Sequence, residues 1–436
     1  MNKPRKIILT TFGSFGDIHP YMAIAMELQR RGHRPLIASG ELYREKIAGA
    51  GIDFAPIRPK IPPPHEQDQE MMDKVMEPKS GPKFLLDEMI LSDVRGSYED
   101  LIALVAGADL LVTHPITVAG PLVAQKTGIA WISSVLAPMS FLSAYDPPMP
   151  PFWPWMANLY ALGPRFTSVF FRFLKTQYRA EPVERVRRAF SLPDIGHPIF
   201  EGQHSPTLVL ALFSSLFGAA QPDWPPQTRI TGFAFYDEPA EMPAELARFL
   251  DEGPPPIVFT LGTSAVWVAR DFYRESITAA KLLGRRAVLL IGDDRNRPDE
   301  PLQPEIIAVN YAPFGAVLSR GCAMVHHGGV GTTSQGLRAG VPTLIVPFAF
   351  DQADNAEHAK RLGGSRTLQR AKYFAARVAK ELDILLTKPE YASKANEVGD
   401  RIRGENGVAV ACDLIEEQLR FGPKPKESEP SYAFSN

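Results

Sequence analysis

The chain has 436 residues, of which 45% are hydrophobic and 22% charged, and its formal net charge is −2 at pH 7. This composition is typical of a globular protein, and the length predicts two or three domains. Because there is no basic surplus, the composition argues against a nucleic-acid partner. The two cysteines, Cys322 and Cys412, argue against a disulfide framework, so we expect buried apolar thiols in a reducing compartment.

The N-terminus begins like a secretory signal, with basic residues ahead of an apolar run. The run stops within a few residues at Gly13, which is too early for a cleavable signal. No segment approaches the about 20 consecutive apolar residues that a membrane span needs. We therefore expect a cytoplasmic protein, and surface contact with a membrane stays open.

The N-terminal half alternates short β-branched apolar segments with amphipathic ones, which is the pattern of strand–helix units. We expect strands at 6–12, 34–39, 53–57, 109–113 and 130–135, with helices at 18–31 and 118–127. Repeated units of this length predict a parallel sheet with right-handed crossovers. The proline- and charge-rich segment 59–83 is expected to be a loop, and 164–189 to be helical.

The same alternation restarts at Pro256, after an acidic stretch that we interpret as a linker. We expect further strands at 257–261, 287–291, 306–309, 323–325 and 343–346. The predicted fold class is therefore α/β, with two doubly wound parallel-sheet domains. We place these domains at 1–238 and 239–422, and we expect residues 423–436, which lack apolar content, to be a disordered tail.

The strongest local signal is the sequence VHHGGVGTTS at 325–334, where a strand runs into a glycine-rich turn and a helix opens. Free N–H groups and the dipole at a helix start favour phosphate, and glycines let the backbone approach an anion closely. The hydroxyls of Thr332 and Thr333 and a histidine would add donors. The alternative is a tight turn with a helix cap and no ligand.

Two aspartates follow strands of the predicted sheets. Asp351, with Gln352 beside it, lies at the carboxyl end of a strand, where open α/β sheets bind ligands, and this pair suits sugar hydroxyls. Asp17 ends the sequence GSFGD, which is not the G-x-G-x-x-G of dinucleotide-binding proteins. Asp17 is a candidate general base, and either aspartate could instead cap the helix that follows it.

Together these features resemble family 1 glycosyltransferases of the GT-B fold, in which two Rossmann-like domains face a cleft. The resemblance rests on HHGGVGTT (326–333), GVP (340–342) and PFAFDQADNA (347–356), which match in order and spacing. GSFGDIHPYMAIAMELQRRGH (13–33) matches the opening of the bacterial antibiotic, sterol and glycolipid branches. Segments 221–233, 248–264 and 310–329 look similar to rhamnosyltransferases of rhamnolipid synthesis, and enzymes that glycosylate flavonoids or macrolides are the alternatives.

The resemblance places the donor site in the second domain, where His327 rather than His326 matches the histidine that binds the donor diphosphate. Gln335 stands where many relatives have a glutamate on the ribose hydroxyls, so preference between UDP and dTDP stays open. The other donor-binding residues that the resemblance implies are Thr263, Ser264, Tyr311, Gly329, Gly331, Thr332, Thr333, Asp351 and Gln352. Among these, Tyr311 is expected to stack on the nucleotide base.

Asp17 occupies the place of the catalytic base, and His19, two positions away, is the second candidate. His114 stands where plant enzymes carry the aspartate that supports their histidine, so an Asp17–His114 pair would reverse that arrangement; His114 could also merely cap a strand end. The aromatic residues expected at the acceptor are Phe15, Phe141, Phe152, Trp153, Trp155 and Tyr160. The last five lie in the irregular segment 138–164, and they could instead only anchor that segment.

The resemblance implies an inverting, metal-independent transfer of a glucose- or rhamnose-class sugar from a UDP- or dTDP-sugar. The acceptor would be a hydroxyl of a small apolar molecule: a flavonoid or other polyphenol, a hydroxy-fatty acid, a macrolide or a sterol. No cofactor is implied beyond the nucleotide-sugar co-substrate, and the last helix is expected to pack back on the first domain. The alternatives are a sugar-nucleotide epimerase of the same fold and a non-catalytic partner of another transferase.

Overall fold

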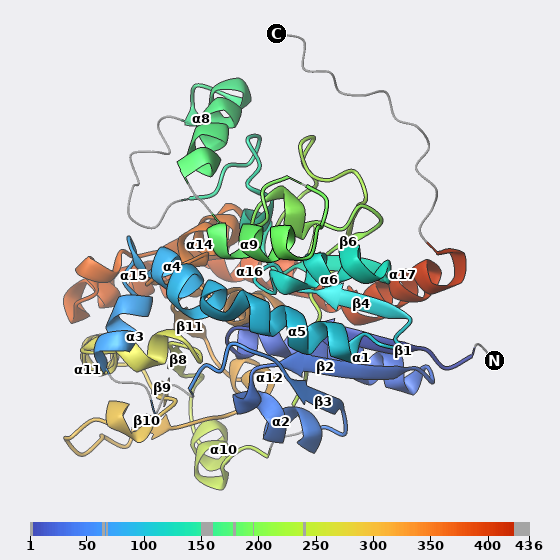
Figure 1. Ribbon diagram of the computed structural model, residues 1–436. Helices are drawn as coiled ribbons and strands as arrows, with labels where there is room; N and C mark the ends of the chain where they lie inside the picture. The colour runs from blue at the N-terminus through green and yellow to red at the C-terminus, as the bar shows by residue number, and fades with distance from the viewer. Residues whose placement is uncertain are drawn as a thin grey trace.

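The protein is described by a computed structural model covering residues 3–62, 66, 69–149, 160–177, 180–194, 196–238 and 241–422. Two parallel β-sheets lie side by side in this part of the chain, each with helices on both faces (Figure 1). The predicted α/β class with two parallel-sheet domains is confirmed. The first sheet ends at Ile230 and the second begins at Ile257, so the expected domain boundary falls between them.

The first sheet has the strand order β3-β2-β1-β4-β5-β6-β7. Its central strands are fully buried, because helices cover both faces and both sets of side chains must be apolar. The strand order reverses between β1 and β4, where the two following loops diverge at the carboxyl edge and open a crevice. The strands are β1 (Lys6–Thr10), β2 (Arg34–Ser39), β3 (Asp53–Pro56), β4 (Leu110–Thr113), β5 (Ala130–Val135), β6 (Val209–Ala211) and β7 (Thr228–Ile230).

The second sheet has the order β10-β9-β8-β11-β12-β13, with the same kind of reversal between β8 and β11. The loops that leave these two strands carry Gly262 and His327, so the second crevice is built from the phosphate-binding candidates. The strands are β8 (Ile257–Thr260), β9 (Ala287–Leu290), β10 (Ile306–Val309), β11 (Ala323–His326), β12 (Thr343–Ile345) and β13 (Ser365–Thr367).

Helices pack on both faces of each sheet and bury two apolar layers per domain. In the first domain they are α1 (Phe15–Arg30), α2 (Arg44–Gly49), α3 (Gln69–Val75), α4 (Gly81–Phe84), α5 (Val94–Leu104), α6 (Ala119–Thr127), α8 (Pro164–Gln177) and α9 (Glu181–Ala189). In the second they are α10 (Ala244–Asp251), α11 (Phe272–Leu282), α12 (Phe314–Leu318), α13 (Val330–Ala339), α14 (Gln352–Arg361), α15 (Ala375–Thr387), α16 (Pro389–Arg403) and α17 (Gly407–Phe421).

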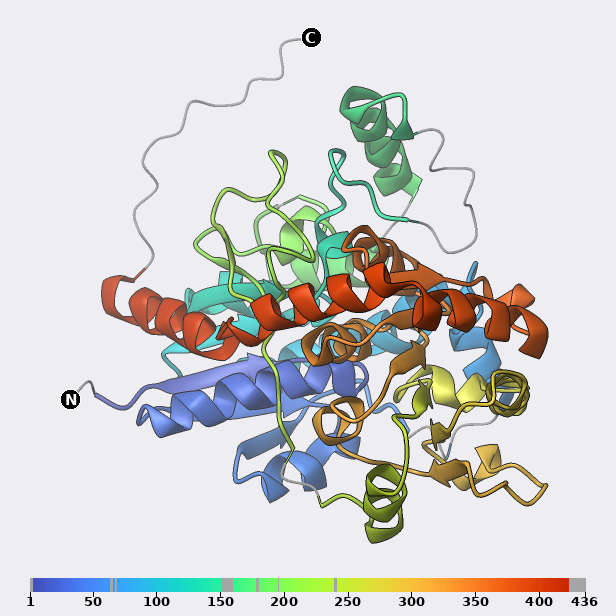
Figure 2. The same cartoon turned by 180° about the vertical axis from the view of Figure 1, so that it is seen from behind.

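Helix α17 returns to the first domain and lies along α1, as Figure 2 shows from behind. Cys412 and Ile415 are buried in the same core as residues of α1 and β1, and the Cys412 thiol contacts the Ile24 carbonyl at 3.7 Å. Arg31 bonds Asp413 at 2.5 Å, at the end of α1. The first strand and the last described helix therefore both pack in the first domain. Both cysteines are free thiols.

The segment 59–83, expected to be a loop, instead contains helices α3 and α4. Met72 and Met76 are buried in the apolar core of the second domain, so tertiary packing stabilises a helix that local composition disfavours. Arg270 also bonds Asp73 at 3.3 Å. Helix α3 is thus a contact between the two domains.

Three strands, β6, β7 and β13, were not expected from the sequence, and each is only three residues long. A run that short shows no periodicity, and its pairing with a neighbouring strand decides its conformation. The expected helical stretch 164–189 forms two helices, α8 and α9. No helix in the described ranges is long and apolar enough to cross a membrane.

Candidate functional site

The two domains meet where α1 and α13 begin. A Cβ atom on Gly331 would lie 3.1 Å from the Cα of Gly16, so the two backbones touch at this point. Both helices point their N-terminal ends, with their partial positive charge, at the junction between the domains. A group bound at this junction would therefore lie near the positive ends of two helix dipoles.

Asp17 is the third residue of α1, and Ser14 is the N-cap. One Asp17 oxygen, Oδ2, accepts hydrogen bonds from the Ser14 backbone N–H at 2.7 Å and from its hydroxyl at 3.1 Å. Asp17 was expected to be either a base or the N-cap of this helix. Ser14 is the N-cap instead, and Asp17, three residues later, accepts the Ser14 N–H and so completes a capping box. The other oxygen, Oδ1, lies 3.5 Å from His114 Nε2.

His114 follows β4, and β4 pairs directly with β1, which brings it to Asp17. Its Nδ1 accepts the backbone N–H of Ile116 at 3.4 Å. A neutral ring with an accepting Nδ1 carries its proton on Nε2, so His114 can donate to Asp17. The Asp17 side chain is 28% exposed and that of His114 is 7% exposed, so Asp17 is the member of the pair that a substrate can reach.

His19 lies two positions beyond the end of the capping box at Asp17, and its ring stacks on Phe15 at a centroid distance of 5.1 Å. Burial, together with the Lys46 ammonium, lowers the pKa of His19 to about 4. Its Nε2 has no hydrogen-bond partner in the described part of the chain. His19 therefore belongs to a neutral aromatic wall of the cleft, together with Tyr236, whose ring is 4.9 Å away.

The neighbouring histidines of the glycine-rich turn have different environments. His326 is the last residue of β11, is fully buried, and its Nδ1 accepts the Gly328 N–H at 3.1 Å. The Nδ1 of His327 has no partner among the described residues. Desolvation lowers the pKa of both rings to about 3. Nδ1 of His326 therefore supports the turn, while His326 Nε2 and His327 Nδ1 are both buried without a partner among the described residues.

The loop after β8 and the turn between β11 and α13 converge on the His327 ring. A Cβ on Gly262 would lie 2.5 Å from ring Cε1 and 3.0 Å from Thr332 Oγ1, and a Cβ on Gly329 would lie 2.5 Å from Nε2. Both positions therefore exclude a side chain. Gly329 is the N-cap of α13, and no described side chain bonds to the first N–H groups of that helix. These donors are free for an anion.

Asp351 and Gln352 begin α14 beside the same turn. Asp351 is the N-cap but its side chain makes no capping bond, and instead accepts Asn355 Nδ2 at 2.8 Å. Burial raises its pKa to about 7, and the Asp17 charge adds to this effect. Gln352 Oε1 already accepts the backbone N–H groups of Phe348 and Ala349. Gln352 therefore has only its amide N–H groups to offer a sugar.

A cavity of about 110 Å³ lies between the domains. Two groups of residues line it. Phe15, His19 and Tyr236 come from the first domain and the start of the linker, and the predicted donor residues in the lining are Thr263, Tyr311, Gly331, Thr332 and Gln335. Phe15, predicted at the acceptor, thus lies beside the donor residues. Ser264 follows Thr263 as the partly buried N-cap of a short turn, and the Thr333 hydroxyl is buried without a partner in the described chain.

Glu238 on the linker joins the two walls of this cavity. It accepts a hydrogen bond from Lys46 at 2.7 Å and another from the Tyr311 hydroxyl. The Tyr311 ring is 48% exposed. Neither Lys46 nor Glu238 was predicted as a site residue, because neither belongs to a motif and their contact joins residues far apart in the chain.

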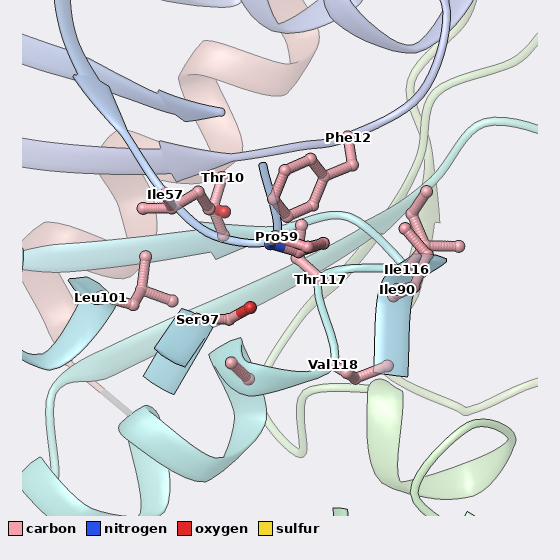
Figure 3. A pocket seen from close by; sticks show the side chains of 11 residues that line it. Thr10, Phe12, Ile57, Pro59, Ile90, Ser97, Leu101, Ile116, Thr117 and Val118 are labelled. Carbon is pink, nitrogen blue, oxygen red and sulfur yellow. The ribbon is translucent and has the colours of Figure 1, made fainter. Parts of the chain in front are cut away.

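A second, smaller cavity lies inside the first domain, between β1 and helices α5 and α6 (Figure 3). Its volume of about 10 Å³ is room for one water molecule. The lining is apolar except for hydroxyls such as those of Thr10 and Thr117, and Thr117 also bonds the backbone of His114. This cavity therefore adjoins the turn that carries His114, and sequence reasoning did not find it.

The predicted acceptor aromatics are separated in the structure. Phe141 stacks on Trp224 at 4.2 Å and on His204 at 5.5 Å, so both ring faces have neighbours. The Tyr160 hydroxyl donates to the Pro148 carbonyl at 3.1 Å. Neither residue lines the two cavities above. The other three, Phe152, Trp153 and Trp155, lie outside the described residues.

Comparisons with known proteins agree with this architecture. Residues 7–119 match the glycosyltransferase family 28 N-terminal domain, and residues 282–415 match the erythromycin biosynthesis protein CIII-like C-terminal domain. The chain is 29% identical over 425 residues to O-mycaminosyltylonolide 6-deoxyallosyltransferase of Streptomyces fradiae, which covers 94% of this chain and 97% of that protein.

A second relative is the sterol 3-beta-glucosyltransferase of Leptosphaeria maculans, at 28% identity over 96% of this chain; the chain spans only 29% of that protein. Among solved structures, the glycotransferase of kitacinnamycin matches with a TM-score of 0.71 and 22% identity, covering 96% of this chain and 100% of the other. Spinosyn rhamnosyltransferase complexed with thymidine diphosphate matches with a TM-score of 0.66 and 17% identity, covering 94% and 100%.

The two-sheet architecture and these structural neighbours define the class: the molecule has the GT-B fold and is a glycosyltransferase. Within that class the chain belongs to the family 1 glycosyltransferases, together with macrolide and sterol enzymes. Sugar transfer of the hexosyltransferase type is therefore its activity.

Proposed function

We propose that the protein transfers a glucose- or rhamnose-class sugar from a dTDP- or UDP-linked donor to a hydroxyl of an apolar acceptor. The transfer inverts the anomeric centre and uses no metal. The observation that carries this proposal is the Asp17–His114 pair at 3.5 Å, which stands at the start of α1 where the first domain meets α13. The pair offers a reachable carboxylate beside the turn that would hold the donor.

On the donor side, the diphosphate would lie on the uncapped start of α13 beside His327. The free N–H groups and the helix dipole supply partial positive charge to the leaving group. The neutral His327 ring would donate a hydrogen bond rather than a full charge. Asp351 would meet sugar hydroxyls, and its proximity to Asp17 places that sugar near the base.

On the acceptor side, Asp17 would take the proton of the attacking hydroxyl as the new glycosidic bond forms and the bond to the diphosphate breaks. With its proton on Nε2, His114 would donate to Asp17 Oδ1, 3.5 Å away, and so orient the carboxylate. His114 is therefore a positioning residue and Asp17 the catalytic one. The nucleotide would lie in the cavity between the domains, with Tyr311 against its base and Gln335 near its ribose.

The choice of donor and acceptor follows the relatives. One relative is named for a macrolide acceptor and another for a sterol, which supports an apolar acceptor. A structural neighbour was solved with thymidine diphosphate, which supports a dTDP-sugar. In Gln335 this chain has a neutral amide at the expected ribose position, and an amide can hydrogen-bond ribose of either nucleotide.

The experiment is a matrix of dTDP- and UDP-sugars against macrolide, sterol, flavonoid and hydroxy-fatty acid acceptors, with free sugars as hydrophilic controls. Nucleotide release that requires an apolar acceptor, with a matching glycoside by mass spectrometry, supports the proposal. Conversion of the donor sugar without any acceptor would indicate an epimerase. Full activity on free sugars alone would contradict the apolar acceptor.

A further inference from the structure

Helix α8 exposes large apolar side chains along one side. Phe166, Val169 and Phe173 are 40%, 56% and 59% exposed, and Leu162, just before the helix, is 63% exposed. Spacings of three and four residues bring these side chains onto one face of a helix. A continuous exposed apolar stripe of this kind marks an interaction surface in a water-soluble domain.

The stripe is not the face with which α8 packs on the protein. Thr167 and Phe171, on the opposite face, are 1% and 5% exposed, and Phe171 makes an edge contact with Tyr160. In both overall views α8 stands at one end of the molecule, away from the two sheets (Figures 1 and 2). The apolar face therefore has no partner within the described chain.

The charged residues of α8 itself are all basic. Arg165 and Arg172, seven residues apart and hence on one side of the helix, are exposed beside it. Lys175 pairs with Glu201 and so contributes less. From 147 to 180 the sequence has four basic residues and no acidic one. Such a surface attracts an anionic partner and repels a basic one.

We propose that α8 is a docking surface for an anionic lipid membrane. Phe166, Val169 and Phe173 enter the boundary between headgroups and acyl chains, while the two guanidinium groups lie at the lipid phosphates. A basic amphipathic helix with aromatic residues on its apolar face is the arrangement that binds in the plane of such an interface. An anionic bilayer is complementary both to the apolar stripe and to the two arginines beside it, whereas a protein partner would not require that every charged residue of α8 be basic.

This inference goes beyond the proposed function, since docking can occur whatever reaction the enzyme performs. It also has a consequence for that reaction. Helix α8 packs next to Tyr160, and the loop before it contacts α14 of the donor domain through the Met149 N–H and Asp354 at 2.9 Å. Docking would bring the cleft close to a phase in which apolar acceptors dissolve.

The test is sedimentation of the full chain with phosphatidylglycerol–phosphatidylcholine vesicles and with pure phosphatidylcholine vesicles, at low and high salt. We expect binding to the anionic vesicles that weakens with salt. The variant Phe166→Ser/Val169→Ser/Phe173→Ser should lose binding at least tenfold. Arg165→Gln/Arg172→Gln removes charge without disturbing packing and should lose about 30-fold on anionic vesicles, on the scale of two interfacial charges.

Two matched controls lie elsewhere on the surface. Leu282→Ser removes an apolar side chain that is 62% exposed, and Lys380→Gln removes an exposed charge. Both should bind vesicles as the wild type does. Nucleotide release with a water-soluble acceptor should be unchanged in the α8 variants, which separates loss of docking from loss of catalysis.

Three outcomes overturn the proposal. The wild type fails to bind anionic vesicles, or both α8 variants bind as well as the wild type. Alternatively, light scattering shows a dimer that the triple serine variant dissociates while no vesicles are bound, in which case the stripe is an interface with a second copy of the chain.

Discussion

The turns after β1 and after β11 are built alike, yet their helix starts are used differently. Each leads through glycines into a helix whose N-terminal end faces the other domain, and the two helices touch at Gly16 and Gly331. In the first turn the protein supplies the anion itself, because Asp17 is held by Ser14 inside a capping box. In the second turn no described side chain caps α13, and its N–H groups stay free. The start of α1 thus holds the carboxylate of Asp17, and the start of α13 has free N–H groups that can bind an anionic ligand.

The largest effect should come from removing the charge at the first turn. Asp17→Asn keeps an oxygen for the Ser14 N–H and so keeps the fold, but cannot accept a proton. Turnover should fall about 100-fold or more, the scale of general-base catalysis, with donor affinity nearly unchanged. Steady-state kinetics and calorimetry with dTDP measure the two quantities.

Ser14→Ala is the matched control, since it removes the cap and leaves the carboxylate. It should lower the free energy of unfolding by about 1 kcal/mol while turnover stays within a few fold. Near-normal turnover in Asp17→Asn would rule out Asp17 as the base.

At the second turn the two histidines separate ligand binding from structure. His327→Ala should weaken nucleotide binding by about 1.5–3 kcal/mol, the value of a hydrogen bond to a charged group. His326→Ala should leave binding closer to wild type but lower the unfolding temperature, because the Gly328 N–H loses its buried acceptor. Calorimetry measures the nucleotide affinity of both variants, and thermal melts measure their stability. Equal losses of nucleotide affinity in the two variants would contradict the assignment of ligand binding to His327 and of structural support to His326.

The carboxylate between the two turns should make stability depend on pH. Burial raises the pKa of Asp351 from 3.8 to about 7, so the folded state holds a proton that the unfolded state has released. The free energy of unfolding therefore falls through this group as pH rises from about 4 to about 7. Asp351→Asn should melt above wild type at pH 8 and bind the sugar donor more weakly. Identical pH profiles for the two proteins would argue against the buried environment.

The smallest expected effect is that of a chelator. If α13 and His327 neutralise the diphosphate, excess EDTA should change the rate by less than twofold. Progress curves with and without EDTA, followed by added Mg²⁺ or Mn²⁺, provide the measurement. A large loss that either metal restores would require a cation in place of these protein groups.

The sequence predicted the parts of this site that are local in the chain. The glycine-rich turn, His327 and the strand–helix order are encoded within a few residues of each other. The strands that were expected lie within about two residues of their observed bounds, whereas β6, β7 and β13 were not expected. Contacts between distant residues gave no such signal. Lys46, Glu238 and Tyr311 come together only through the packing of two domains, and α3 forms because its methionines enter a core built from the other half of the chain.

The Asp17–His114 pair falls between these cases. Each residue follows a strand, which the sequence reveals, but their separation depends on the pairing of β1 with β4. The tautomer that would let His114 donate to Asp17 then follows from the Ile116 N–H on His114 Nδ1, a backbone contact that no sequence pattern predicts.

The central claim is a single displacement in which Asp17 activates the acceptor hydroxyl. The most direct measurement is the anomeric configuration of the product, determined by NMR from the coupling constant of the transferred sugar after reaction with a donor of known configuration. An in-line attack across the cleft predicts complete inversion, so an α-linked glucose donor should give only the β-glycoside. A product that retains the donor configuration would contradict the account, because a single in-line displacement cannot retain the configuration of the anomeric carbon.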